Sequence, residues 1–287
     1  MSISPSPPSG VRPHGNRSRI LIPLLACGYV GVLILLPALQ VVAGALAKGW
    51  QPFVENFSNP DMLSAIRLTL LMAAIAVPAN SIFGLAAATA IARRQFPGKA
   101  FLLSVIDLPF SISPVVVGLM LVLLYSPTNG LLRDVVGQLG WRIIFSWPGM
   151  ALATIIVTFP FMAREVIPLL EEEGWDQEEA ARTLGATNWQ VFWNVTLPSV
   201  RWAVLYGLVL TTARALGEFG AVAVVSGNIA GQTQTLPLFV EDSYKQYNTE
   251  LAYGAALVLG GVGLVSLLLK LLVERLVGGL KDTKPFN

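Results

Sequence analysis

The sequence predicts an all-α membrane protein with six transmembrane helices. The chain is 54% hydrophobic and only 13% charged, whereas about a quarter of the residues in soluble domains are charged. Its mean hydropathy is +0.65, and its long apolar runs reach the roughly 20 residues that a helix needs to cross a bilayer. Six such spans with short connections take up most of the 287 residues. We therefore expect one membrane domain.

The two ends of the chain differ in composition from the rest. Residues 1–19 are rich in Pro, Ser, Gly and Arg, a composition that buries too little apolar surface to offset the entropy of ordering. We expect a disordered cytoplasmic tail there, a membrane domain over 20–275 and a second cytoplasmic tail over 276–287. The uncharged run 20–47 is longer than the roughly 7 to 15 residues of a signal-peptide core, which favours an uncleaved first span.

Five further apolar segments follow, and each predicts one span. The fifth span is interrupted by Arg214 and Glu218, and prolines stand inside several of the others. Such prolines are tolerated in membranes where neighbouring helices satisfy the freed backbone groups, so we expect a packed bundle with kinks. The spans are 68–92, 108–132, 143–163, 202–225 and 251–269, and the prolines include Pro78, Pro109, Pro114 and Pro160.

Basic residues near the span ends predict the orientation. Lys and Arg accumulate in cytoplasmic loops, and with both termini inside, the cytoplasmic segments carry thirteen of them and the outer segments five. The same count places the loop between the fourth and fifth spans, about 171–200, in the cytoplasm. The inner residues are Arg12, Arg17, Arg19, Arg93, Arg94, Lys99, Arg164, Arg182, Arg201, Lys270, Arg275, Lys281 and Lys284, and the outer ones are Lys48, Arg67, Arg133, Arg142 and Lys245.

This cytoplasmic loop carries two helix-start patterns. Asp176 followed by Glu179 resembles a capping box, and Gly185 suits the left-handed residue that ends a helix. Thr187 with Gln190 forms a second box. The loop therefore predicts two short helices joined by a glycine turn, with the chain turning toward the fifth span at the Leu-Pro pair 197–198. An amphipathic loop of this kind either lies on the membrane surface or receives another protein.

The spacing of the loop motif resembles a known signature. Glu179-Ala180-Ala181, then Gly185, then Val195-Thr196-Leu197-Pro198 is similar to the Glu-Ala-Ala signature of ABC importer permeases, with Val195 where the family most often has isoleucine. The run from Ala213 to Ala221 resembles the fifth-span motif of sulfate, thiosulfate, molybdate and tungstate permeases. Several other runs resemble the W-type sulfate/thiosulfate permeases in particular; they lie at 65–70, 106–110, 145–150, 225–229, 236–238 and 247–249.

The resemblance implies a fold, a role and partners. The fold would be a type I ABC importer permease bundle in a bacterial inner membrane, crossed several times. The partners would be a homologous permease, two copies of an ATPase and a periplasmic sulfate-binding protein. The loop 171–200 would be the coupling loop, where the ATPase would contact Glu179, Ala180, Ala181, Gly185, Leu197 and Pro198. No Gly-x-x-x-x-Gly-Lys-Ser/Thr run occurs in the sequence, so we expect ATP and Mg to be bound by the ATPase and no cofactor in this subunit.

A doubly charged anion needs positive charge or convergent donors to cross the membrane. Arg214 is the basic residue deep within a span, and Glu218 follows one helical turn later. The pair either fixes packing between the permeases or lines the pathway, where Arg214 exchanges Glu218 for the anion. Thr211 and Thr212 are candidate donors to the anion or to backbone carbonyls. Asp107 is expected to be a local cap or hydrogen-bond acceptor.

Other functions are disfavoured by what the sequence lacks. The formal net charge is +2, too small an excess to suggest nucleic acid, and the single cysteine, Cys27, can form no internal disulfide. No His-Glu-x-x-His run and no Gly-x-Ser-x-Gly elbow occurs, so we predict no catalytic or metal-ligating residues. The alternatives are a permease for a related oxyanion such as molybdate, and a stand-alone carrier or membrane enzyme. The outer connection 226–246 is either a docking and gating segment or an ordinary solvated loop.

Overall fold

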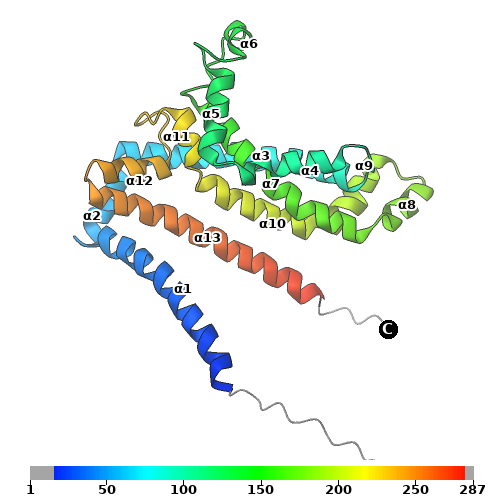
Figure 1. The fold of residues 1–287 in the computed structure, drawn as a ribbon, viewed down its shortest axis with the longest axis horizontal. Helices are drawn as coiled ribbons and strands as arrows, with labels where there is room; N and C mark the ends of the chain where they lie inside the picture. Colours follow the sequence, from blue (N-terminus) through cyan, green and yellow to red (C-terminus); the bar gives the residue numbers. More distant parts are fainter. Residues whose placement is uncertain (1–15, 282–287) are drawn as a thin grey trace, which may run out of the picture.

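The computed structural model describes residues 16–281, and within this range every regular element is helical. Four long helices run side by side along the longest axis of the molecule (Figure 1): α3 (Pro60–Ala92), α7 (Trp147–Glu173), α10 (Leu197–Leu216) and α13 (Thr249–Lys281). The short helices α8 (Asp176–Thr183) and α9 (Asn188–Val191) lie at one end of this bundle, and α2 (Trp50–Glu55) and α12 (Leu236–Lys245) lie at the other. The predicted all-α membrane fold is confirmed.

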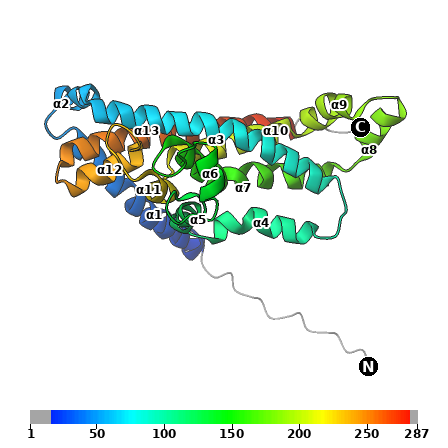
Figure 2. The same ribbon diagram turned by 90° about the horizontal axis from the view of Figure 1, so that it is seen from above.

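The first helix, α1 (Asn16–Ala45), diverges from the bundle (Figure 1) and runs obliquely to the long helices (Figure 2), and it contacts α13. At this contact Gly44 faces the ring of Tyr253, and nearby Lys48 Nζ lies 2.6 Å from Glu250 Oε2. Of the two predicted tails, residues 16–19 belong to α1 and residues 276–281 belong to α13. Once an apolar run nucleates a helix, each added residue gains a hydrogen bond at little cost, so the helix extends into its polar flank. The remaining tail residues, 1–15 and 282–287, lie outside the described residues.

The centre of the bundle is built on small residues. Gly84 of α3 and Gly207 of α10 both face Met162 of α7, and a Cβ added at Gly84 would lie 2.8 Å from Met162 Cβ. Beside this contact, the buried amide of Asn80 donates from Nδ2 to Thr158 Oγ1 over 2.7 Å. Close approach at small residues and polar bonds between helices are how membrane helices associate. These contacts join α3, α7 and α10 into one packed unit.

The predicted third span, 108–132, is not a single helix. The chain forms α4 (Lys99–Ser111) and α5 (Pro114–Tyr125), which meet at 108°. Ile112 and Ser113 are extended, with ψ of 138° and 135°; Pro114 explains this, because it disfavours the helical conformation in the residue before it and has no N–H of its own. In Figure 1, α5 and α6 (Arg133–Gln138) project from the side of the bundle. Proline therefore breaks this span instead of merely kinking it.

The predicted fifth span, 202–225, is also broken. It consists of α10 and the short helix α11 (Gly220–Ser226), with Glu218 in the connection between them. Helix α11 packs against α5, where a Cβ on Gly118 would lie 2.7 Å from the carbonyl oxygen of Ala221. Within 16–281, five helices are long and apolar enough to cross a membrane, and the bent pair of α4 and α5 makes a sixth crossing when it is counted as one span.

The end of the bundle opposite to α8 is held by short polar connections. A 3-10 turn, η1 (Asn56–Ser58), precedes Asn59, whose side chain accepts from Asp61 N over 2.9 Å and caps α3. The start of α12 is buried, and Leu236 N donates to Thr69 Oγ1 of α3 over 2.8 Å. The solvated-loop interpretation of 226–246 is therefore wrong for the start of α12, which packs into the bundle.

Candidate functional site

The loop between α7 and α10 folds as two helices with a tight turn. Helix α8 begins at Asp176, but the residue at its N-cap position is Trp175 and no side chain caps it, so the predicted box of Asp176 and Glu179 is wrong. The turn follows the prediction: Gly185 has φ of 89°, and Ala186 N donates to Ala181 O over 3.1 Å. Glycine adopts this left-handed conformation without the steric cost that a Cβ imposes.

The second predicted capping box is confirmed. Thr187 N donates to Gln190 Oε1 over 2.8 Å, and Gln190 N donates to Thr187 Oγ1 over 3.4 Å. Helix α9 then passes through a π-helical turn, η2 (Phe192–Thr196), directly into α10. We expected the chain to turn at Leu197 and Pro198, but it continues there as a helix. A π-helical turn loosens the backbone ahead of Pro198, whose ring would otherwise crowd the preceding turn.

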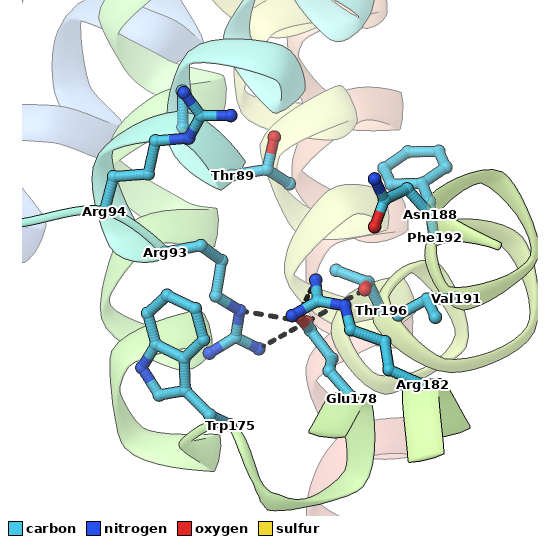
Figure 3. A pocket seen from close by; sticks show the side chains of 11 residues that line it. Thr89, Arg93, Arg94, Trp175, Glu178, Arg182, Asn188, Val191, Phe192 and Thr196 are labelled. Atoms are coloured by element: carbon cyan, nitrogen blue, oxygen red, sulfur yellow. Dashed lines mark hydrogen bonds and ion pairs between the residues drawn. The ribbon is translucent and has the colours of Figure 1, made fainter. Parts of the chain in front are cut away.

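The loop is anchored by Glu178, which is buried with 4% of its surface exposed. Its Oε1 accepts from Arg93 Nε and from Thr196 Oγ1, each over 2.9 Å, and Arg93 Nη2 lies 2.9 Å away. Arg182 Nη2 lies 3.7 Å from the other carboxylate oxygen. Figure 3 shows these side chains converging from α3, α8 and η2. The sequence prediction named the neighbouring Glu179 and missed this anchor, because the partner Arg93 is 85 residues distant in sequence.

A cavity of about 820 Å³ opens beside the anchor, between the end of α3 and the loop helices (Figure 3). Its wall combines guanidinium groups with aromatic rings and small polar side chains. The lining residues are Thr89, Ala90, Arg93, Arg94, Trp175, Glu178, Arg182, Asn188, Val191, Phe192 and Thr196. The loop therefore rests on α3 through a few polar contacts rather than through a packed apolar interface.

The predicted contact residues lie on the other side of α8. Glu179 is exposed, as are Ala180 and Gly185, and Leu184 is 88% exposed. Ala181 is the exception, since it is half-buried. The last two predicted residues, Leu197 and Pro198, lie in the first turn of α10. One face of the loop thus carries the anchor, and the other presents small and apolar side chains to the surroundings.

The predicted anion-pathway residues lie at the far end of α10. Arg214 Nη1 is 2.7 Å from Glu218 Oε2, an ion pair in which the side chains are 31% and 1% exposed. The prediction that the two residues share one helical face is wrong, because α10 ends at Leu216 and Glu218 belongs to the break. The other carboxylate oxygen, Glu218 Oε1, accepts from Ala221 N over 3.0 Å. At 1.5 Å per residue, the pair is roughly 25 Å along α10 from the loop between α7 and α10.

The two threonines behave differently. Thr212 Oγ1 donates to Leu208 O over 2.7 Å, a bond within its own helix. Thr211 is fully buried, and its hydroxyl has no hydrogen-bond partner within the described residues. Asp107 accepts from Arg164 Nε over 2.7 Å, so it is a partly exposed ion-pair acceptor between α4 and α7. In the described part of the chain no three His, Cys, Asp or Glu side chains gather as a metal site would require.

The sequence matches a known family of membrane proteins over most of its length. The model of the binding-protein-dependent transport system inner membrane component family matches residues 80–280. The chain belongs to this family. It is therefore a non-catalytic permease component of an ABC importer and a multi-pass inner-membrane protein.

Relatives within this family resemble the chain along most of its length. The sulfate transport system permease protein CysW of Synechococcus elongatus is 62% identical over 267 residues, which are 92% of this chain and 93% of that protein. The sulfate transport system permease protein CysT of Escherichia coli K12 is 37% identical over 243 residues, or 85% and 86% of the two chains. A chain in the crystal structure of a bacterial ABC transporter involved in the import of alginate matches with a TM-score of 0.73 and 18% identity, over 93% and 97% of the chains.

Proposed function

We propose that this permease carries sulfate, and thiosulfate as a second oxyanion, through the inner membrane in a transport cycle driven by ATP hydrolysis. The observation that carries the proposal is the 62% identity over nearly the whole chain to a protein named as a CysW sulfate permease, against 37% to a CysT protein. Both kinds of permease resemble the chain, which supports pairing with a CysT-like second permease. Two ATPase copies, which bind ATP and Mg, and a periplasmic binding protein complete the proposed assembly.

The proposed contact with the ATPase is the exposed face of α8 and the turn after it. The small, exposed side chain of Ala180 permits close approach of another protein, and Leu184 offers apolar area that is 88% exposed. Helix α8 is anchored to α3, and its loop is continuous with α7 and α10. Movement of α8 by a bound ATPase therefore displaces these three membrane helices. We also propose that this end of the bundle is cytoplasmic, since Arg93, Lys99 and other basic residues counted above gather at the helix ends there.

The proposal is tested by uptake of labelled sulfate into proteoliposomes that hold the complete complex, with the binding protein on the outer side and ATP on the inner side. We expect uptake with ATP and none with ADP. Thiosulfate in excess should compete, and molybdate should compete weakly. Uptake that persists without the ATPase would contradict the ABC mechanism, and stronger competition by molybdate than by thiosulfate would overturn the substrate.

The role proposed for Arg214 is to line the anion pathway, with Glu218, Thr211 and Thr212 around it. Its side chain is 31% exposed although its partner Glu218 is buried, and the buried Thr211 hydroxyl has no partner within the described residues. Arg214→Gln should abolish sulfate uptake while the complex assembles normally. Arg201→Gln is the matched control, because Arg201 lies on the same helix and stacks on Trp202 at 5.2 Å. Loss of assembly in Arg214→Gln would instead support a packing role.

A further inference from the structure

Arg93, the residue at the C-cap of α3, bonds both the end of α7 and the coupling loop. Its Nη1 donates to Leu170 O over 2.7 Å and to Gly174 O over 2.6 Å, at the end of α7. Its Nε donates to Glu178 Oε1 over 2.9 Å, and its guanidinium carbon lies 5.6 Å from the ring centre of Trp175. The side chain is 13% exposed. One guanidinium therefore joins the end of α3 to the end of α7 and to α8.

These bonds form a connection that the backbone does not provide. The loop is covalently continuous with α7 on one side and with α10 on the other, whereas Arg93 precedes Glu178 by 85 residues. Near the loop, α3 meets α8 across the cavity of about 820 Å³, where Arg93 supplies the polar contacts. Further along, α3 packs tightly on α7 at Gly84 and Met162. A displacement of α8 can therefore reach α3 at its end through Arg93 and Glu178.

The chemistry of the site favours arginine over any other cation. The planar guanidinium has donors fixed in a fork, so it can hold two carbonyl oxygens and a carboxylate at the same time, whereas a lysine ammonium is a point charge on a flexible stem. The positive charge also lies at the C-terminus of α7, where the helix dipole and the unpaired carbonyls favour a cation. Glu178 in turn accepts from Thr196 Oγ1 at the start of the path into α10.

We propose that Arg93 is a positioning residue, which through Glu178 fixes the coupling loop to α3 so that movement of the loop by the ATPase moves α3 together with α7 and α10. This inference rests on the proposed function, in which α8 receives the ATPase. Without the pair, the loop would still dock on the ATPase, but part of its displacement would become rotation of α8 against the end of α3. Hydrolysis would then continue while transport falls.

The test measures sulfate uptake per ATP hydrolysed in proteoliposomes of the complete complex with the binding protein. In Arg93→Lys and Arg93→Gln we expect the complex to assemble and to hydrolyse ATP, with the uptake per ATP reduced about tenfold, as for a typical coupling free energy between sites. Arg94→Gln is the matched control: Arg94 is the next residue and lines the same cavity, but makes no hydrogen bond or ion pair within the described chain. It should keep the wild-type ratio.

A second variant, Glu178→Gln, keeps the volume of the side chain and removes its charge. It should lower uptake per ATP in the same direction, and the double variant with Arg93→Lys should be no worse than the more severe single variant, because both act through one contact. Uptake and hydrolysis falling in equal proportion, or Arg94→Gln losing the same ratio, would overturn the proposal. So would failure of both Arg93→Lys and Glu178→Gln to assemble, since the pair would then serve folding. Failure of the proposed function itself appears separately, as absent ATP-dependent sulfate uptake in the wild-type complex.

Discussion

Two adjacent glutamates in the coupling loop have opposite surroundings, and this difference can be measured. Glu178 is buried and accepts from Arg93 and Thr196, whereas the side chain of Glu179 is exposed and makes no hydrogen bond or ion pair within the described residues. Glu178→Gln should therefore loosen the loop. Glu179→Gln should leave the loop folded, although it alters the face that we propose for the ATPase.

The size of the effect follows from the bonds between Glu178 and Arg93. Loss of one partner of a buried ion pair costs about 3–5 kcal/mol. In Glu178→Gln the amide oxygen can still accept from Arg93, which keeps roughly 1–2 kcal/mol, so the cost should be about 2–3 kcal/mol. The cost stays below the roughly 3–5 kcal/mol of a fully stranded buried charge, because Arg93 keeps its bonds to Leu170 O and Gly174 O. At about 1.4 kcal/mol per factor of ten, the loop should open about 30- to 150-fold more often.

Hydrogen exchange reports this opening directly, because amides in a locally unfolding segment exchange in proportion to its open population. The measurement is best made on the purified permease pair without the ATPase, so that docking does not cover the loop. Amides of 176–196 should lose about 30- to 150-fold protection in Glu178→Gln. Protection within about threefold of the wild type, or an equal loss in Glu179→Gln, would refute the assignment of Glu178 as the anchor.

Three other substitutions test the fold. Gly84→Leu should overpack the contact with Met162 and destabilise the complex by about 1–3 kcal/mol in thermal unfolding, whereas Gly260→Leu, where nothing lies within 4 Å, should not; equal melting of the two would contradict the close approach. Gly185→Val should cost about 1–3 kcal/mol, because a β-branched residue is strained at φ of 89°, and should speed exchange in the loop. Asp107→Asn removes a partly exposed ion pair, so stability should change by less than about 1 kcal/mol; a larger loss would mean that the pair is more deeply desolvated than its exposure indicates.

The positions of the spans could be predicted because a membrane helix is specified locally. Length and apolarity of a run decide whether it can cross the bilayer, and both are visible in the sequence. The breaks could be predicted less well. Pro78 lies inside continuous α3, while Pro114 begins a new helix at 108° to the last one. Whether a proline breaks the helix depends on the tertiary contacts of the segment that follows it. Helix α5 is held in its new direction by the contact of Gly118 with Ala221 of α11, two residues that are far apart in sequence.

In the loop between α7 and α10 as well, local features could be predicted from the sequence and long-range contacts could not. The turn at Gly185 and the capping box of Thr187 with Gln190 follow from residues within five positions of one another, and the structure has both. The buried carboxylate could not be identified from the loop alone, since Glu178 and Glu179 are chemically identical neighbours. Their environments differ because Arg93 arrives from another helix. The one sequence signal for this anchor is the basic residue Arg93 at the end of an earlier span. In the sequence, however, Arg93 is equally well explained as one of the basic residues that set the orientation in the membrane.

Two buried carboxylates of the described chain, Glu178 and Glu218, each belong to an ion pair that also binds a helix end. Arg93 satisfies carbonyls at the end of α7, and Glu218 satisfies the N–H of Ala221 at the start of α11, so each pair bonds backbone that a helix terminus leaves unpaired. The charge thus serves to join helix ends, and an ion pair in the membrane here does not by itself mark an anion route. What distinguishes Arg214 is that its partner is almost wholly buried while its own side chain remains 31% exposed. A guanidinium that is paired on one side and open on the other can receive an anion while its bond to Glu218 stays formed, so transport and the joining of helix ends do not exclude one another at Arg214.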